Sequence, residues 1–169
     1  MASVWMTCGK ICSGKSTYAQ ELRKRHRAAV LSVDEITLAL FGPEPGEKLD
    51  DYVQRAEAYL YQKSVELVET GINVVLDWGF WTKRERDEAR AFYAARGISC
   101  FFHYLEISDQ EWSRRIGKRN AAVLARQTDG YYVDGGLQAK FAAIFEPPSP
   151  DEIDVWISVK EDEHDRKTL

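Results

Sequence analysis

The sequence predicts an α/β domain in which helices cover a parallel sheet. Short apolar runs alternate along the chain with segments of helical periodicity, which is typical of repeated strand–helix–strand units. The run at residues 98–107 is almost continuously apolar, as expected of a central strand that is buried on both faces. A glycine-rich loop separates the first apolar run from the first helical segment. Right-handed crossovers then give a doubly wound sheet with its ligand crevice at the carboxyl ends of the strands.

Composition fits one globular domain. The chain has 169 residues, of which 44% are hydrophobic and 30% charged, so residues 1–169 can form a single core. The net charge of −4 argues against a wide nonspecific surface for nucleic acid. Three cysteines do not suggest a disulfide framework. The sequence shows no signal peptide and no apolar stretch long enough to span a membrane. We therefore expect a cytoplasmic protein that does not enter a membrane.

Five apolar runs are predicted to be strands. Each is short and is followed by polar residues, glycine or proline. The runs cover residues 3–8, 28–33, 72–76, 98–107 and 154–159. The second and third runs lead directly into Asp34 and Asp77, which places a carboxylate at the carboxyl end of each strand.

Helices are predicted between these runs. Two of them open with the capping boxes TKRE and SDQE, in which a hydroxyl and a glutamate satisfy the first backbone N–H groups. The predicted helices cover residues 15–26, 50–70, 82–97, 108–119 and 137–145. Residues 41–48 are rich in proline and glycine and are expected to form a loop. Residues 120–136 show no clear period, and the charged tail at 160–169 is expected to fray.

The loop after the first strand carries the strongest motif. Its sequence GKICSGKST matches G-x-x-x-x-G-K-[ST] in full, between a predicted strand and a predicted helix. In such a loop, backbone N–H groups and the positive end of the helix surround a phosphate. Lys15 would reach the β- and γ-phosphates of ATP, and the Ser16 hydroxyl would ligate Mg²⁺. The predicted nucleotide-binding residues are Gly9, Lys10, Ile11, Cys12, Ser13, Gly14, Lys15, Ser16 and Thr17.

The two aspartates at the strand ends are candidates for the chemistry. Asp34 would overlook the γ-phosphate and could deprotonate an acceptor hydroxyl, although a helix N-cap is a common alternative for such an aspartate. Asp77 resembles the carboxylate of a Walker B strand, which supports Mg²⁺. A place in the substrate site and a simple turn residue are the other interpretations of Asp77.

Arginines on the predicted helix 108–119 are candidates for contacting phosphate. On a helical wheel, Arg115 and Arg119 share a stripe with Trp112 and Ile116, so both should face the protein body. There they need anions, and phosphate oxygens suit the arginine fork. Structural ion pairs with acidic neighbours are the alternative. Arg126 is a weaker candidate in the following segment.

Aromatic side chains follow the third strand. Trp78, Phe80 and Trp81 would either form a wall of an acceptor pocket or anchor their loop by packing, and the sequence does not decide between the two. Arg84 and Arg86, in the next helix, could each hold a substrate anion, but we interpret them mainly as solvated surface charges. Cys12 lies in the phosphate loop and could be reactive, but we assign it no catalytic role.

These residues together resemble the small P-loop kinases. The group includes phage-type polynucleotide kinase, gluconate kinase, chloramphenicol phosphotransferase and zeta-toxin kinases. The resemblance extends to about Ile157 and is closest to bacterial predicted kinases with the segments DWGFWT at 77–82 and RIGKRN at 115–120. It implies the strand order 2-3-1-4-5, helices on both faces, and a mobile lid over about residues 120–136. It also implies that Asp34 is the base on the acceptor side and that Arg115 and Arg119 contact the transferring phosphate.

The leading functional hypothesis is a phosphotransferase that moves the γ-phosphate of Mg-ATP to a hydroxyl of a small molecule. The net negative charge and the aromatic cluster favour a small-molecule acceptor over a polynucleotide 5′-hydroxyl. Nucleic acid is therefore a possible partner, but not the favoured one. A nucleotide-binding ATPase or switch without an acceptor is the other alternative. No N-K-x-D motif supports a GTPase. The acceptor, the adenine contacts and the oligomeric state do not follow from the sequence.

Overall fold

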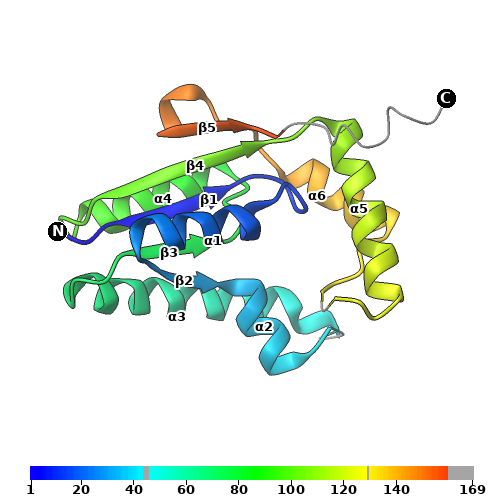
Figure 1. Ribbon diagram of the computed structural model, residues 1–169, viewed down its shortest axis with the longest axis horizontal. Coiled ribbons are helices and arrows are strands. Elements are labelled where there is room, and N and C mark those ends of the chain that lie inside the picture. Colours follow the sequence, from blue (N-terminus) through cyan, green and yellow to red (C-terminus); the bar gives the residue numbers. More distant parts are fainter. Residues whose placement is uncertain (44–45, 129, 160–169) are drawn as a thin grey trace.

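The computed structural model describes residues 1–43, 46–128 and 130–159. Its centre is a parallel sheet of five strands in the order β2-β3-β1-β4-β5, which confirms the predicted fold class and strand order (Figure 1). The strands are β1 (Val4–Cys8), β2 (Ala29–Ser32), β3 (Val74–Asp77), β4 (Cys100–Glu106) and β5 (Val155–Ser158). The predicted tail at 160–169 lies outside the described residues.

Helices cover both faces of the sheet. They are α1 (Lys15–His26), α2 (Val33–Phe41), α3 (Leu49–Glu69), α4 (Lys83–Ala94), α5 (Asp109–Leu124) and α6 (Gly135–Ile144), with short 3₁₀ turns η1 (Gly46–Lys48) and η2 (Pro150–Glu152). One face packs against α1, and the other packs against α3 and α4. Past the carboxyl ends of the strands, α2 and α5 lie apart from each other, with α2 after β2 and α5 after β4 (Figure 1). Within the described ranges, no helix combines the length and apolarity of a membrane span.

Alternation along β3 sends neighbouring side chains to different faces. Leu76 belongs to the core under α3 and α4, whereas Val75 belongs to the core under α1. Because the side-chain period of a strand is two, the next two residues continue the alternation. Asp77 points to the α1 side, where it meets Thr7, and Trp78 packs with the α3 and α4 core. The sheet therefore separates these two neighbouring side chains.

The second strand ends earlier than its apolar pattern predicted. β2 stops at Ser32, whose hydroxyl accepts a hydrogen bond of 3.3 Å from the Glu35 backbone and caps α2. A serine cap competes with continued strand pairing because it satisfies a free N–H group of the new helix. Asp34 therefore lies in the first turn of α2, so its placement at the strand end was wrong, and the N-cap is Ser32 instead.

α5 is longer than predicted and the following segment rests on it. The helix continues to Leu124 instead of ending near Arg119, because Ala121, Ala122 and Leu124 are strong helix formers. The Asn120 side chain donates to the Val133 carbonyl (2.6 Å) and accepts from the Val133 N–H (2.9 Å). Val133 is buried in a cluster with side chains of α5. The ends of the segment predicted as a lid are thus joined, while its mobility stays a prediction.

Candidate functional site

The loop between β1 and α1 has the shape that a phosphate requires. Gly9 and Gly14 have φ angles of +147° and +101°, which favour glycine. A Cβ at Gly9 would lie 2.8 Å from the Leu105 carbonyl oxygen, so a side chain there would clash with backbone. α1 starts at Lys15 without a side-chain cap. Its first N–H groups and its positive end are therefore available to an anion.

Two polar side chains of the loop fit a bound triphosphate. The Lys15 ammonium donates to the backbone carbonyls of Gly9 (3.1 Å) and Lys10 (2.7 Å), which holds it over the loop. Burial lowers the pKa of Lys15, while the charges of Asp77 and Asp34 oppose this shift. The Ser13 hydroxyl is buried and has no hydrogen-bond partner among the described residues. An orphaned group of this kind in a loop of this shape suits an oxygen-rich ligand.

Two carboxylates converge beside the loop. Asp77 is buried and accepts hydrogen bonds from the Ser16 hydroxyl and, at 3.4 Å, from the Thr7 hydroxyl. Burial raises the pKa of Asp77, and the bond from Ser16 opposes that effect. Asp34 is exposed, and its charge acts on both Lys15 and Asp77. The structure therefore brings the two predicted aspartates to the predicted loop, with the Asp77 side chain on the side of Ser16.

α5 lies against the same loop. The Trp112 indole donates to the Ile11 carbonyl (2.8 Å), and the Arg115 Nη1 donates to the Ser13 carbonyl (3.3 Å). The Arg119 Nη1 contacts the Cys12 sulfur at 3.6 Å. Both arginines on the predicted stripe therefore reach the phosphate-binding loop. Arg126 follows the end of α5 in an exposed position.

Arg115 also makes the kind of ion pair that the sequence left as an alternative. Its Nε lies 2.6 Å from Oε1 of the buried Glu111. The hydrogen bond from Arg114, which outweighs burial, and the bond from Arg115 together hold the pKa of Glu111 at about 2. Glu111 therefore stays ionised at neutral pH and fixes the Arg115 side chain beside the loop.

The segment after β3 is tied to the phosphate-binding loop. The Gly9 N–H donates to the Gly79 carbonyl at 3.0 Å. Phe80 is buried with φ +45°, and Trp81 packs on Phe141 of α6 with ring centroids 4.9 Å apart. Of the two interpretations of the aromatic cluster, anchoring by packing thus describes Phe80 and Trp81. Trp78 lines a cavity, to which the Phe80 ring also contributes.

Arg86 holds this segment and is not the solvated charge that its sequence position suggested. It is only 1% exposed, and it donates to the Phe80 carbonyl (3.0 Å) and to the Glu152 carboxylate (2.7 Å). The ion pair joins α4 to η2, and the hydrogen bond to the Phe80 carbonyl joins α4 to the segment after β3. Its partner lies 66 residues away in the sequence, which is why local pattern did not reveal the burial.

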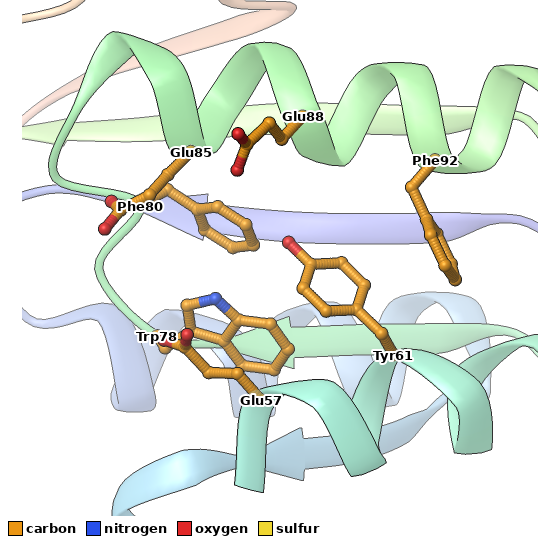
Figure 2. A pocket seen from close by; sticks show the side chains of 7 residues that line it. All are labelled: Glu57, Tyr61, Trp78, Phe80, Glu85, Glu88 and Phe92. Atoms are coloured by element: carbon orange, nitrogen blue, oxygen red, sulfur yellow. The ribbon is translucent and has the colours of Figure 1, made fainter. Parts of the chain in front are cut away.

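A cavity lies beside Trp78, in line with the pocket-wall interpretation of the aromatic cluster, whereas its walls on α3 and α4 were not predicted from the sequence. It has a volume of about 190 Å³ and lies between α3 and α4 (Figure 2). Its lining residues are Glu57, Tyr61, Trp78, Phe80, Glu85, Glu88 and Phe92. Its helical residues follow helical spacing, since Glu57 and Tyr61 are four residues apart on α3, and Glu85, Glu88 and Phe92 are three and four residues apart on α4. This spacing alone does not show that the two stripes face each other.

The sheet order and the loop define the fold of the small P-loop kinases. A family model described as AAA domain matches residues 4–134, and the chain belongs to this family. No curated protein is significantly similar to the chain in sequence. The structure nevertheless resembles several solved structures, all at low identity, so that the likeness concerns the fold.

Three solved structures illustrate the likeness. A proposed kinase from Chloroflexus aurantiacus has 17% identity and a TM-score of 0.72, with 94% of this chain and 84% of that chain covered. The APS kinase of Mycobacterium tuberculosis in complex with AMPPNP and APS has 18% identity and a TM-score of 0.66, with 95% and 90% covered. The Pnkp1/Rnl/Hen1 RNA repair complex contains a chain with 20% identity and a TM-score of 0.67. The match covers 84% of this chain but only 43% of that chain.

Proposed function

We propose that the protein is an ATP-dependent phosphotransferase that moves the γ-phosphate of Mg-ATP to the hydroxyl of a small molecule. The observation that carries the proposal is the convergence of Lys15, Asp34 and Asp77 at a loop that the arginines of α5 also contact. The loop and the N-terminus of α1 supply the phosphate cradle. The fold of the small P-loop kinases supports this class of reaction.

The metal and the nucleotide would be held by groups on the α1 side of the sheet. Ser16 and Asp77 fit Mg²⁺, because they place a hydroxyl and a carboxylate oxygen together at the loop. When bound, Mg²⁺ would neutralise phosphate charge and orient the phosphate chain. Lys15 would turn from the loop carbonyls that it now contacts to the β- and γ-phosphate oxygens.

The chain's own residues would then assist the transfer. The acceptor oxygen forms a bond to the γ-phosphorus, the bond from that phosphorus to the β–γ bridging oxygen breaks, and ADP leaves. Asp34 accepts the hydroxyl proton, for which its exposed carboxylate in the first turn of α2 is suited. Arg115 and Arg119 offset the charge on the transferring group.

The lid segment would close this site from the α5 side. The Tyr131 hydroxyl donates to the Thr37 hydroxyl of α2 at 3.1 Å, so residues 130–133 span from α5 to α2. A guanidinium nitrogen of Arg119 would lie 3.1 Å from a Cβ at Gly130, which puts this arginine beneath the segment. Closure would exclude water, which otherwise competes with the acceptor for the phosphate.

The proposal is tested by measuring phosphate transfer directly. The protein would be incubated with Mg-ATP labelled at the γ-phosphate and with separate pools of small alcohols and of oligonucleotides with 5′-hydroxyl ends. We expect label to appear on a small alcohol and Lys15→Met to abolish it. Label on oligonucleotides alone would favour a polynucleotide kinase. Steady ATP hydrolysis that no acceptor changes would favour an ATPase or switch.

A further inference from the structure

The cavity between α3 and α4 is walled by aromatic rings. The Tyr61 ring stands at 82° to the Trp78 ring with centroids 5.5 Å apart, and its centroid is 5.0 Å from that of Phe92. Trp78 in turn stacks on Phe80 at 5.2 Å. Figure 2 shows these side chains reaching toward one another from the two helices and from the segment after β3. The ring contacts fix the shape of the wall before any ligand arrives.

Carboxylates complete the lining, and one of them lacks a partner. Glu85 uses Oε2 to accept from the Thr82 N–H in the capping box of α4. Glu88 uses Oε1 to pair with Arg84 at 2.7 Å on the exposed side. Glu57 is half-buried and makes neither a hydrogen bond nor an ion pair with any described residue. The cavity therefore contains negative charge that these described partners do not neutralise.

The surroundings of Glu57 make its ionisation costly. Burial, with the charge of Glu85 adding to it, raises the pKa of Glu57 to about 7. Burial and the same carboxylates also raise the pKa of Tyr61, so the phenol stays neutral. At the far end, the Arg96 guanidinium lies over the outer Phe92 ring at 3.7 Å. A cation inside the cavity would stabilise the ionised form of Glu57 and so offset the free-energy cost of its ionisation.

We propose that this cavity binds the positively charged group of the acceptor, and that the acceptor is a small organic ammonium compound that carries a hydroxyl. Aromatic rings with carboxylates are the lining that recognises ammonium groups, whereas carboxylates repel phosphates and acids. This inference rests on the proposed phosphotransferase function, because it assigns the bound cation to the acceptor.

Size and position agree with such a subsite. The volume of about 190 Å³ is below the range typical of drug-sized ligands, so the cavity takes a small group and not a whole large molecule. Trp78, which forms one wall, directly follows Asp77 in the chain. Because the Asp77 and Trp78 side chains point to opposite faces of the sheet, an acceptor held in the cavity would have to extend around the carboxyl end of β3 to reach the phosphate-binding loop. The same carboxylates would repel a polynucleotide backbone, which favours the small-molecule acceptor.

The experiment compares cationic probes with neutral probes of the same shape. Calorimetry at pH 8 would measure binding of choline against 3,3-dimethyl-1-butanol and of ethanolamine against ethylene glycol. We expect the cationic member of at least one pair to bind more tightly by about tenfold or more. If neither cation binds more tightly than its neutral counterpart, the proposal is overturned.

Two glutamate variants on α3 locate the binding. Glu57→Gln keeps the side-chain shape and is expected to weaken cation binding by about tenfold, the order expected for a lost ion pair with a half-buried group. Glu66→Gln is the matched control, since Glu66 is exposed on the same helix and pairs with Lys63 outside the cavity. Equal loss in both variants, or no loss in Glu57→Gln, would contradict the assignment of the cavity.

The pH profile gives a readout that a purely structural role of Glu57 would not produce. Ionisation of Glu57 around pH 7 should raise cation affinity by about tenfold between pH 6 and pH 8, with a flat profile in Glu57→Gln. The other titratable and charged groups at the cavity are common to both proteins, so the difference between the profiles isolates Glu57. These groups are Tyr61, Arg84, Glu85, Glu88 and Arg96.

Binding and turnover are measured separately, so the two proposals can fail independently. A cation that binds through Glu57 while no acceptor takes up phosphate would refute the phosphotransferase and leave the cation site standing. Phosphate transfer to neutral alcohols, without preference for any cationic probe in calorimetry, would refute the cation site and leave the phosphotransferase standing.

Discussion

Breaking the ion pair between Arg86 and Glu152 tests how the segment after β3 is held. The Arg86 and Glu152 side chains are 1% and 8% exposed, with 2.7 Å between Nε and Oε2. Arg86→Met removes this contact and the bond to the Phe80 carbonyl, and it leaves a buried carboxylate without its cation. Breaking a buried pair in this way costs about 3–5 kcal/mol in the free energy of unfolding.

The titration of Glu152 gives an upper value for this loss, because the hydrogen bonds from Ser149 persist in Arg86→Met. Burial opposes its ionisation, but hydrogen bonds from Arg86 and Ser149 outweigh burial and hold the pKa of Glu152 at about 2, compared with 4.5 ordinarily. This difference corresponds to about 3 kcal/mol. Because the folded-state pKa is depressed, the contribution is complete above pH 4.5 and is lost as the pH falls toward 2.

Urea unfolding at pH 7 measures the loss, and a neighbouring arginine supplies the control. Arg84 pairs with Glu88 at 2.7 Å, but its side chain is 85% exposed, so Arg84→Met should leave the free energy of unfolding nearly unchanged. The double variant Arg86→Met/Glu152→Leu should recover part of the loss, since no charge is then left buried. A loss of less than about 1 kcal/mol in Arg86→Met would refute the reasoning.

Four further predictions concern the proposed chemistry. Lys15→Met should abolish tight Mg-ATP binding in calorimetry without unfolding the protein, and unchanged affinity would argue against the loop assignment. Asp34→Asn should slow phosphate transfer by roughly 10²–10⁴-fold at unchanged ATP affinity, whereas lost binding with impaired folding would make Asp34 structural. Arg119→Ala should reduce turnover far more than ATP binding. Residues 120–136 should gain hydrogen-exchange protection with an ATP analogue and acceptor, and equal protection in both states would contradict the lid prediction.

Sequence patterns predicted the elements whose structure depends on residues close together in the chain. The phosphate-binding loop follows from the φ requirements of Gly9 and Gly14 and from a lysine at a fixed spacing, all within nine residues. Parallel strand order followed from the resemblance to a family and was confirmed by the pairing of β1 with β3 and β4. The end of β2 was misplaced because apolar periodicity continues through Val33, while the Ser32 cap that ends the strand is a single hydroxyl.

Features that depend on distant partners could not be predicted. Arg86 looks like any charge in a helical first turn until Glu152 is brought to it by the return of the chain after α6. The cavity needs α3 and α4 to lie side by side, and neither helix alone shows which of its glutamates will face the other. In the sequence, Glu57 resembles the other acidic residues of α3. Only the aromatic rings that pack around it in the fold distinguish it from them.

The opposite orientations of Asp77 and Trp78 have a consequence for how the protein can be altered. If the proposed roles hold, phosphate handling and ligand preference would be set on opposite faces of the sheet by side chains that are adjacent in the chain. Substitutions on α3 and α4 can therefore reshape the cavity while the bond from Ser16 to Asp77 persists. A library varied at Glu57, Tyr61 and Glu88 should diversify the compounds bound and leave nucleotide affinity nearly constant, so that specificity can be re-engineered as an independent module.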